Sequence, residues 1–203
     1  MIQMGVYQEL AVARLKEFGA YLGEPEHEVL LPIRQVPPDT KVGDVIRVFV
    51  YCDSEDRPVA TTRDPKVTAG SFAAVEVVDV TEHGAFVDIG LERDLLVPFG
   101  EQHEPLKLGE TVVVFMSVHG PTQRLIGATR LAPYFRDDVE CLSEGQRVEL
   151  LVYAHNDAGA QVVIDREFRG IAYHDQIYRA VEIGEALTGW VRHVREDGFV
   201  DVS

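Results

Sequence analysis

The sequence has few residues that could form covalent or metal cross-links. It contains two cysteines in 203 residues, Cys52 and Cys141, and no Cys-x-x-Cys pair. A structural zinc site and a disulfide framework are therefore not expected, and a reducing cytoplasm is the predicted location. The seven histidines show no close spacing, so we predict no metal site.

Long apolar runs and catalytic sequence motifs are also missing. No stretch is long enough to cross a bilayer, and residues 1–10 lack the basic and apolar parts of a signal peptide. The sequence has no phosphate-binding Gly-x-x-x-x-Gly-Lys-Ser/Thr motif, no Gly-x-Ser-x-Gly and no His-Glu-x-x-His. We therefore predict no contact with a membrane, no enzymatic activity and no cofactor.

Positive charge is scarce. Lys and Arg number 19 against 34 Asp and Glu, which gives a formal net charge of −15. Non-specific affinity for nucleic acid comes largely from cations that neutralise phosphates, so a uniformly basic binding surface is excluded. A local basic stripe, or stacking of bases on aromatic rings, stays open.

What the sequence does contain is a threefold internal repeat. Three kinds of position recur in the same order at nearly the same spacing: a Gly-Ala pair, a proline or its equivalent, and a second glycine. These positions are Gly19, Pro32 and Gly43; Gly84, Pro98 and Gly109; and Gly159, Ala172 and Gly184. The repeat predicts three domains, at residues 1–66, 67–136 and 137–203.

Each copy has the pattern of five short strands. In the second copy, β-branched and apolar runs predict strands at 75–80, 84–90, 94–99, 110–118 and 124–129. Alternation places Phe86 and Asp88 on one face of their strand, with Ala85, Val87 and Ile89 on the other. We predict an all-β fold of three tandem five-stranded barrels with little helix.

The third copy is expected to be incomplete. In the repeat alignment Ser203 lies opposite Thr62 and Thr129, and the first two copies continue beyond that point. This pattern predicts a third barrel that is cut short, in a fragment of a longer protein.

The second copy resembles the RNA-binding repeat of ribosomal protein S1, which is an OB-fold. The resemblance is carried by GAFVDIG at 84–90, LLVPF at 95–99, KLGETVVV at 107–114 and RLIGATR at 124–130. It implies that the barrels are S1-like OB-folds that bind nucleic acid.

A second resemblance covers essentially the whole chain. Pro98, shared with Pro32, and the opening residues up to Thr62 are similar to the conserved virulence factor B family. Members of that family are bacterial proteins with tandem S1-like repeats followed by a winged helix, which does not follow here. The family implies RNA binding linked to regulation of virulence gene expression.

The S1 pattern implies a set of ring positions for base stacking. Phe86 and its first-copy counterpart Tyr21 occupy the ring position of the second strand, where the third copy has Gln161. His83 and Phe99 are further candidates. A place in the barrel core is the alternative for Phe86, Tyr21 and Phe99.

Arginines are the candidate phosphate contacts, with ordinary surface charge as the alternative for each. The candidates are Arg93, Arg124 and Arg130 in the second copy and Arg57 and Arg63 in the first. The predicted function is binding of single-stranded RNA, with single-stranded DNA as a further candidate ligand. The alternative is a protein-interaction or scaffold module that docks on the ribosome, a polymerase or another protein, favoured by the acidic third copy.

Overall fold

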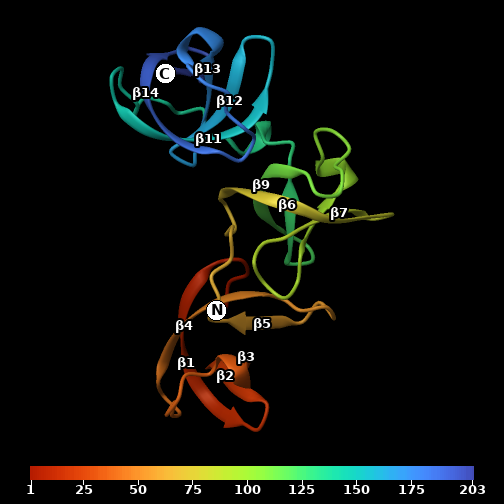
Figure 1. Cartoon of the computed structure of the whole chain (residues 1–203). Coiled ribbons are helices and arrows are strands. Elements are labelled where there is room, and N and C mark those ends of the chain that lie inside the picture. Colours follow the sequence, from red (N-terminus) through yellow and green to blue (C-terminus); the bar gives the residue numbers. More distant parts are fainter.

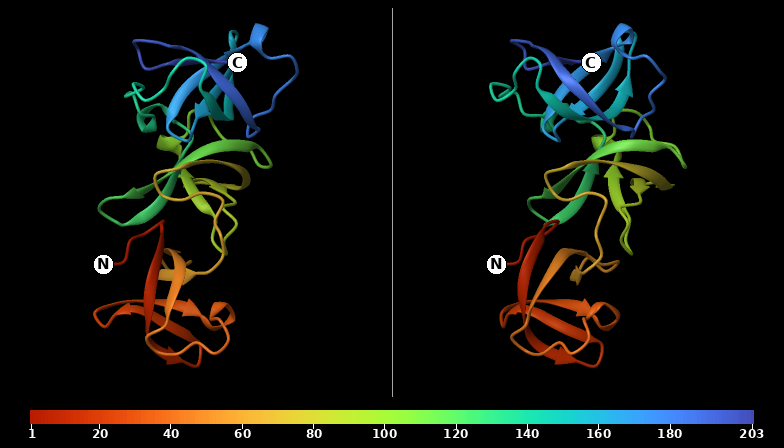
Figure 2. Two further views of the ribbon diagram at one scale, coloured as in Figure 1. Left: turned by 90° about the vertical axis from the view of Figure 1, so that its left-hand side faces the viewer. Right: turned by 60° about the vertical axis from the view of Figure 1, so that its left-hand side comes forward.

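The computed structural model describes all of residues 1–203. It consists of three five-stranded units joined by turns and single-turn 3-10 helices, and the second unit lies between the first and the third (Figures 1 and 2). No helix has the length and apolar character needed to span a membrane. The prediction of an all-β fold with three tandem S1-like OB-fold units is confirmed, and we retain the proposed limits of 1–66, 67–136 and 137–203 for the units.

The strands of each unit follow the same order along the chain. The first unit contains β1 (Tyr7–Lys16), β2 (Gly19–Glu24), β3 (His27–Pro32), β4 (Val45–Cys52) and β5 (Pro58–Thr61). The second contains β6 (Phe72–Thr81), β7 (Gly84–Val87), β8 (Leu95–Pro98), β9 (Thr111–His119) and β10 (Arg124–Ala128). The third contains β11 (Arg147–His155), β12 (Gly159–Ile164), β13 (Phe168–Tyr173), β14 (Ala186–Val194) and β15 (Val200–Val202).

Four 3-10 helices complete the fold. Three of them follow the third strand of a unit, and the other follows the last strand of the second unit. They are η1 (Ile33–Gln35), η2 (Phe99–Glu101), η3 (Ala132–Tyr134) and η4 (His174–Gln176).

Alternation of side chains builds each core. In β7 and the residue pair after it, Ala85, Val87 and Ile89 are buried, whereas Phe86 and Asp88 on the other face are partly exposed. This matches the predicted alternation, in which successive side chains point to opposite faces of a strand. The ring position of the second strand therefore lies outside the barrel.

The three units close in different ways. In the first and third units, the third strand pairs in parallel with the fifth, and the barrel is closed. The third unit closes although it was expected to be cut short, because the three residues of β15 are enough to pair with both β13 and β14.

The second unit lacks the corresponding backbone pairing between β8 and β10. There the gap is filled by side chains, since Leu95 and Val97 lie against Gly127. A Cβ atom at Gly127 would come within 2.9 Å of Val97 and 3.0 Å of Leu95. Apolar packing, rather than a strand ladder, joins these two strands.

The hairpin register corrects one detail of the repeat alignment. Gly19 faces Pro32 and Gly84 faces Pro98, but Gly159 faces Tyr173 rather than Ala172. The sequence spacing predicts Ala172 at the proline position, whereas backbone pairing places Tyr173 there. The Tyr173 ring thereby shares the outer face with Gln161.

A ring pair between the first and fourth strands joins each of the first two units to the next. In the first unit, Tyr7 and Phe49 lie with ring centroids 5.6 Å apart, and Phe49 is fully buried against the core of the second unit. The equivalent pair in the second unit is Phe72 and Phe115, 4.9 Å apart.

The segment after β10 covers the ring pair of the second unit. Phe135 stacks on Phe72 with centroids 5.1 Å apart, and Tyr134 stacks on Phe115 at 4.2 Å. Val163 of β12 is buried in the same cluster. An aromatic cluster therefore holds the second and third units together.

We expect Phe135→Ala to lower the free energy of unfolding by about 3 kcal/mol, because it removes a buried ring and leaves a cavity. Urea denaturation followed by circular dichroism measures the change. Phe99→Ala is the matched control and should stay within about 0.5 kcal/mol of the parent, since Phe99 is 53% exposed. Equal losses in the two variants would contradict the packing role of Phe135.

Candidate nucleic-acid interface

The outer face of the β2–β3 hairpin in the first unit carries an aromatic side chain flanked by a cation. Tyr21 lies between the buried Ala20 and Leu22, so it points away from the core and is half-exposed. Arg14 is its partner across the β1–β2 ladder, and the guanidinium carbon lies 4.1 Å from the Tyr21 ring centroid. Glu28 holds the same guanidinium through an ion pair of 2.8 Å.

A second ring extends this face. Phe18, in the turn before β2, is 57% exposed, and its ring meets that of Tyr21 edge-on at 6.3 Å. The N–H of Ile33 donates to the Phe18 carbonyl oxygen at 2.9 Å, which places η1 beside the turn. Lys16 and Arg34 flank these elements, and both are exposed without a carboxylate partner.

The β7–β8 hairpin of the second unit also carries an outward-facing ring, but the residue across from that ring is acidic instead of basic. Phe86 points outward and is half-exposed, but its partner across the ladder is Asp79 instead of an arginine. His83 occupies the place of Phe18 and is exposed, with Glu82 at 3.7 Å. Phe99, at the start of η2, is also exposed rather than part of the core.

Asp88 shares the outer face with Phe86, but its charge is partly neutralised. Lys66 forms an ion pair with the carboxylate, and the N–H of Gly90 donates to it at 2.7 Å. The hydrogen bond from Lys66 is the main reason why the pKa of Asp88 lies below its usual range. The paired carboxylate repels an approaching phosphate less than a free one would.

The β12–β13 hairpin of the third unit has no ring at the position of Tyr21 and Phe86, although Tyr173 lies on the same face. Gln161 stands where the other units have Tyr21 and Phe86, and Ala154 lies across from it. The phenol of Tyr173 accepts a hydrogen bond from Arg195, which also pairs with Asp201 at 2.6 Å. The polar groups on this face are therefore largely engaged with one another.

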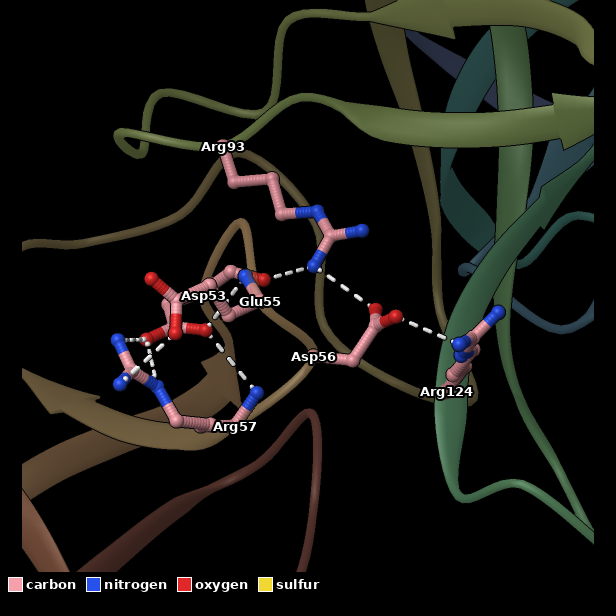
Figure 3. A network of polar contacts seen from close by, with 6 residues as sticks. All are labelled: Asp53, Glu55, Asp56, Arg57, Arg93 and Arg124. Carbon is pink, nitrogen blue, oxygen red and sulfur yellow. Dashed lines mark hydrogen bonds and ion pairs between the residues drawn. The ribbon is translucent and has the colours of Figure 1, made fainter.

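Two of the predicted arginines lie between the first and second units and hold the same carboxylate (Figure 3). Asp56, in the turn between β4 and β5, pairs with Arg93 at 3.1 Å and with Arg124 at 2.5 Å. Arg93 also donates to the backbone carbonyl of Asp53. The structure thus places Arg93 and Arg124 in a contact between units, away from the hairpin faces.

The remaining predicted arginines differ in how closely acidic side chains hold their guanidinium groups. Arg57 is held by Asp53 and Glu55, each at 2.9 Å, and Arg63 lies 3.8 Å from Glu92. Arg130 has no carboxylate partner; its guanidinium donates to the Gln102 carbonyl oxygen at 3.4 Å, and its backbone N–H donates to the Glu101 carbonyl of η2 at 3.0 Å. Of the five, only Arg130 both lacks a carboxylate partner and lies next to a hairpin face.

The sequence analysis missed four residues of the first-unit face: Arg14, Lys16, Phe18 and Arg34. A closer internal alignment would have found Phe18, because it occupies the same place before the Gly-Ala pair as His83. The cross-strand position of Arg14 depends on a bulge in β1, which sequence spacing does not reveal. No cluster of three or more His, Cys, Asp or Glu residues that could hold a metal ion is found.

Comparison with known proteins identifies the family. Residues 4–63 and 69–127, more than half of the chain, match the family model described as S1 domain. The chain belongs to the S1 domain family. In the S1 domains of the first and second units, the hairpin faces described above lie within the matched residues.

Relatives and a solved structure extend the likeness to the third unit. The chain is 31% identical over 206 residues to "Uncharacterized protein YitL" of Bacillus subtilis, covering 96% of this chain and 67% of that protein. It is 20% identical over 156 residues to "Conserved virulence factor B" of Staphylococcus epidermidis, covering 73% of this chain and 52% of that protein. The resemblance to the conserved virulence factor B family is thereby confirmed.

A crystal structure from Streptococcus pneumoniae, described as a multidomain protein with nucleic acid binding domains, shares the fold. It aligns with a TM-score of 0.59 and 20% identity, over 98% of this chain and 73% of that one.

The Lys66–Asp88 pair gives a prediction about pH. Because the pKa of Asp88 is lowered in the native state, the ion pair stabilises that state fully at pH values above the ordinary carboxyl pKa of about 3.9. This stabilisation is lost as the pH falls through the lowered pKa of the native state. In Lys66→Met the pKa of Asp88 should rise part of the way back, since the Gly90 N–H still donates. Carboxyl ¹³C NMR titration measures it, and an unchanged Asp88 pKa would show that Lys66 does not set it.

Proposed function

We propose that this chain binds single-stranded RNA without catalysis, on the hairpin faces of its first and second S1 domains. The arrangement of Tyr21 with Arg14 over its ring and Phe18 at its edge carries the proposal. Single-stranded bases stack on aromatic rings and on guanidinium planes. The family, and the description of the S. pneumoniae structure as holding nucleic acid binding domains, support the same function.

The first unit is the stronger of the two sites. Its face combines two rings with Lys16 and Arg34, which have no carboxylate partner, and with Arg14, which lies over the Tyr21 ring and pairs with Glu28. In the second unit, Phe86, His83 and Phe99 supply rings, whereas Asp79 faces Phe86 and Arg130 is the unpaired cation next to η2. Single-stranded DNA offers the same bases and phosphates and is a second ligand of this kind.

Phosphate contacts are assigned to Lys16, Arg34 and Arg130, with the loosely held Arg63 as a further contributor. Arg57, Arg93 and Arg124 are left out because acidic groups already engage their guanidinium groups. With a net charge of −15, binding should be weak and should fall steeply as salt is added.

We further propose that the bound RNA links this protein to regulation of gene expression in the bacterial cytoplasm. The named relatives are bacterial, and one carries the name conserved virulence factor B.

We expect Tyr21→Ala to weaken binding of a labelled oligouridylate roughly five- to hundredfold, the range supplied by stacking of one base. Phe86→Ala should have a smaller effect, because Asp79 faces that ring. Gln161→Ala is the matched control in the third unit and should bind like the parent. Fluorescence anisotropy at low salt measures all three. If the parent shows no binding, the scaffold alternative replaces this function.

The salt dependence of binding tests the phosphate contacts separately. For single strands the slope of log K against log salt changes by about 0.7 for each phosphate contact that is lost. Arg34→Gln and Arg130→Gln should each flatten the slope by this amount, whereas Arg57→Gln should leave it unchanged. A flatter slope for Arg57→Gln alone would reverse the assignment.

A further inference from the structure

The carboxylate of Asp56 lies where a phosphate group would fit. Its two oxygens accept from different arginines of the second unit, Oδ1 from Arg93 at 3.1 Å and Oδ2 from Arg124 at 2.5 Å (Figure 3). A phosphodiester also carries two free oxygens, and guanidinium groups bind phosphate oxygens through charge-assisted hydrogen bonds of the same kind. The two arginines therefore form a pair that can hold a backbone phosphate in place of Asp56.

The pair is accessible to solvent. Arg93 belongs to the segment that joins β7 to β8, and Arg124 is the first residue of β10. Their side chains are 36% and 56% exposed, and that of Asp56 is 36% exposed. Ion pairs that water reaches in this way contribute little to stability and are weakened by salt. A ligand of the same charge can therefore compete with Asp56 for the two guanidinium groups.

The contact between the first two units does not depend on this bridge. Phe49 and Tyr51, on the strand that leads into the turn of Asp56, are buried in the core cluster of the second unit. This apolar contact remains when the carboxylate moves away. Opening of the bridge thus requires a movement of the Asp56 side chain and no separation of the units.

The other acids of the β4–β5 turn are already engaged. Arg57 holds the carboxylates of Asp53 and Glu55, each at 2.9 Å. Arg93 also donates to the backbone carbonyl oxygen of Asp53, which positions the guanidinium without neutralising its charge. Displacement of Asp56 therefore leaves two cations that have no other carboxylate partner.

We propose that Arg93 and Arg124 form a binding site for a backbone phosphate of single-stranded nucleic acid, and that Asp56 is an intramolecular competitor for this site. In the free protein Asp56 occupies the site. A strand already bound on the hairpin faces presents its phosphates at an effective concentration on the order of millimolar, which favours the exchange. The inference rests on the proposed function, because it takes the same ligand, and it adds a contact that the chain itself regulates.

Removal of the Asp56 charge tests the site. Asn is tolerated in the left-handed backbone conformation of residue 56, where φ is 60°, so Asp56→Asn should fold like the parent, which circular dichroism checks. We expect it to bind labelled oligouridylate roughly fivefold or more tightly than the parent, measured by fluorescence anisotropy at low salt without phosphate in the buffer. Asp56→Gly, which also adopts this backbone conformation, is a second variant with the same expected result.

The salt dependence shows whether the gain is a phosphate contact. For Asp56→Asn the slope of log K against log salt should become steeper by about 0.7, the value for one additional phosphate contact on a single strand. Glu55→Gln is the matched control, because it removes an equal charge from the preceding position of the same turn, where Arg57 is the partner. It should leave both the affinity and the slope close to those of the parent.

Arginine variants show whether the gain is local. In Asp56→Asn/Arg93→Gln/Arg124→Gln the gain in affinity should disappear. Asp56→Asn/Arg166→Gln/Arg179→Gln removes the same number of positive charges from exposed sites of the third unit, and it should retain most of the gain.

The possible results separate this inference from the proposed function. RNA binding by the parent with an unchanged affinity and slope in Asp56→Asn would overturn the Arg93–Arg124 site and leave the hairpin faces standing. Equal gains in Asp56→Asn and Glu55→Gln would show a general effect of charge and would also overturn the site. Binding by Asp56→Asn but not by the parent would support the site and overturn the hairpin faces, and absence of binding in every variant would overturn both.

Discussion

Packing of aromatic rings between the first and fourth strands of one unit and the body of the next is the interaction on which this molecule depends. Phe49 is buried against the core of the second unit, and Phe72 lies in a cluster that reaches Val163 of the third. Each barrel alone is small, so burial of these rings adds apolar contact that a single unit cannot supply. The chain of three units is thus continuous through its cores.

This mode of assembly leaves the hairpin faces of the units free. Because the contacts between units use the first and fourth strands, Tyr21 on β2 and Phe86 on β7 remain at the surface. The same position across the ladder holds Arg14, Asp79 and Ala154 in the three units. The repeated fold is therefore kept while the charge next to the second strand changes from one unit to the next.

Prediction from sequence succeeded where an effect is local to one strand. The alternation around Phe86 placed its ring outside the barrel, because side-chain direction follows the backbone with a period of two. It could not show that Arg93 and Arg124 pair with Asp56, because that partner belongs to another unit, 37 and 68 residues away along the chain. It also missed Arg14, which reaches Tyr21 through a bulge that no sequence pattern marks.

The sequence by itself determined the all-β class, the threefold repeat and the outward direction of Phe86, since these follow from composition and from short-range periodicity. Only the tertiary structure decided which cations already have a carboxylate partner, and that the third barrel closes through Val200–Val202. The reason is physical: ion pairing and burial depend on distances between residues that are far apart in the chain, and these distances exist only once the barrels have folded and packed.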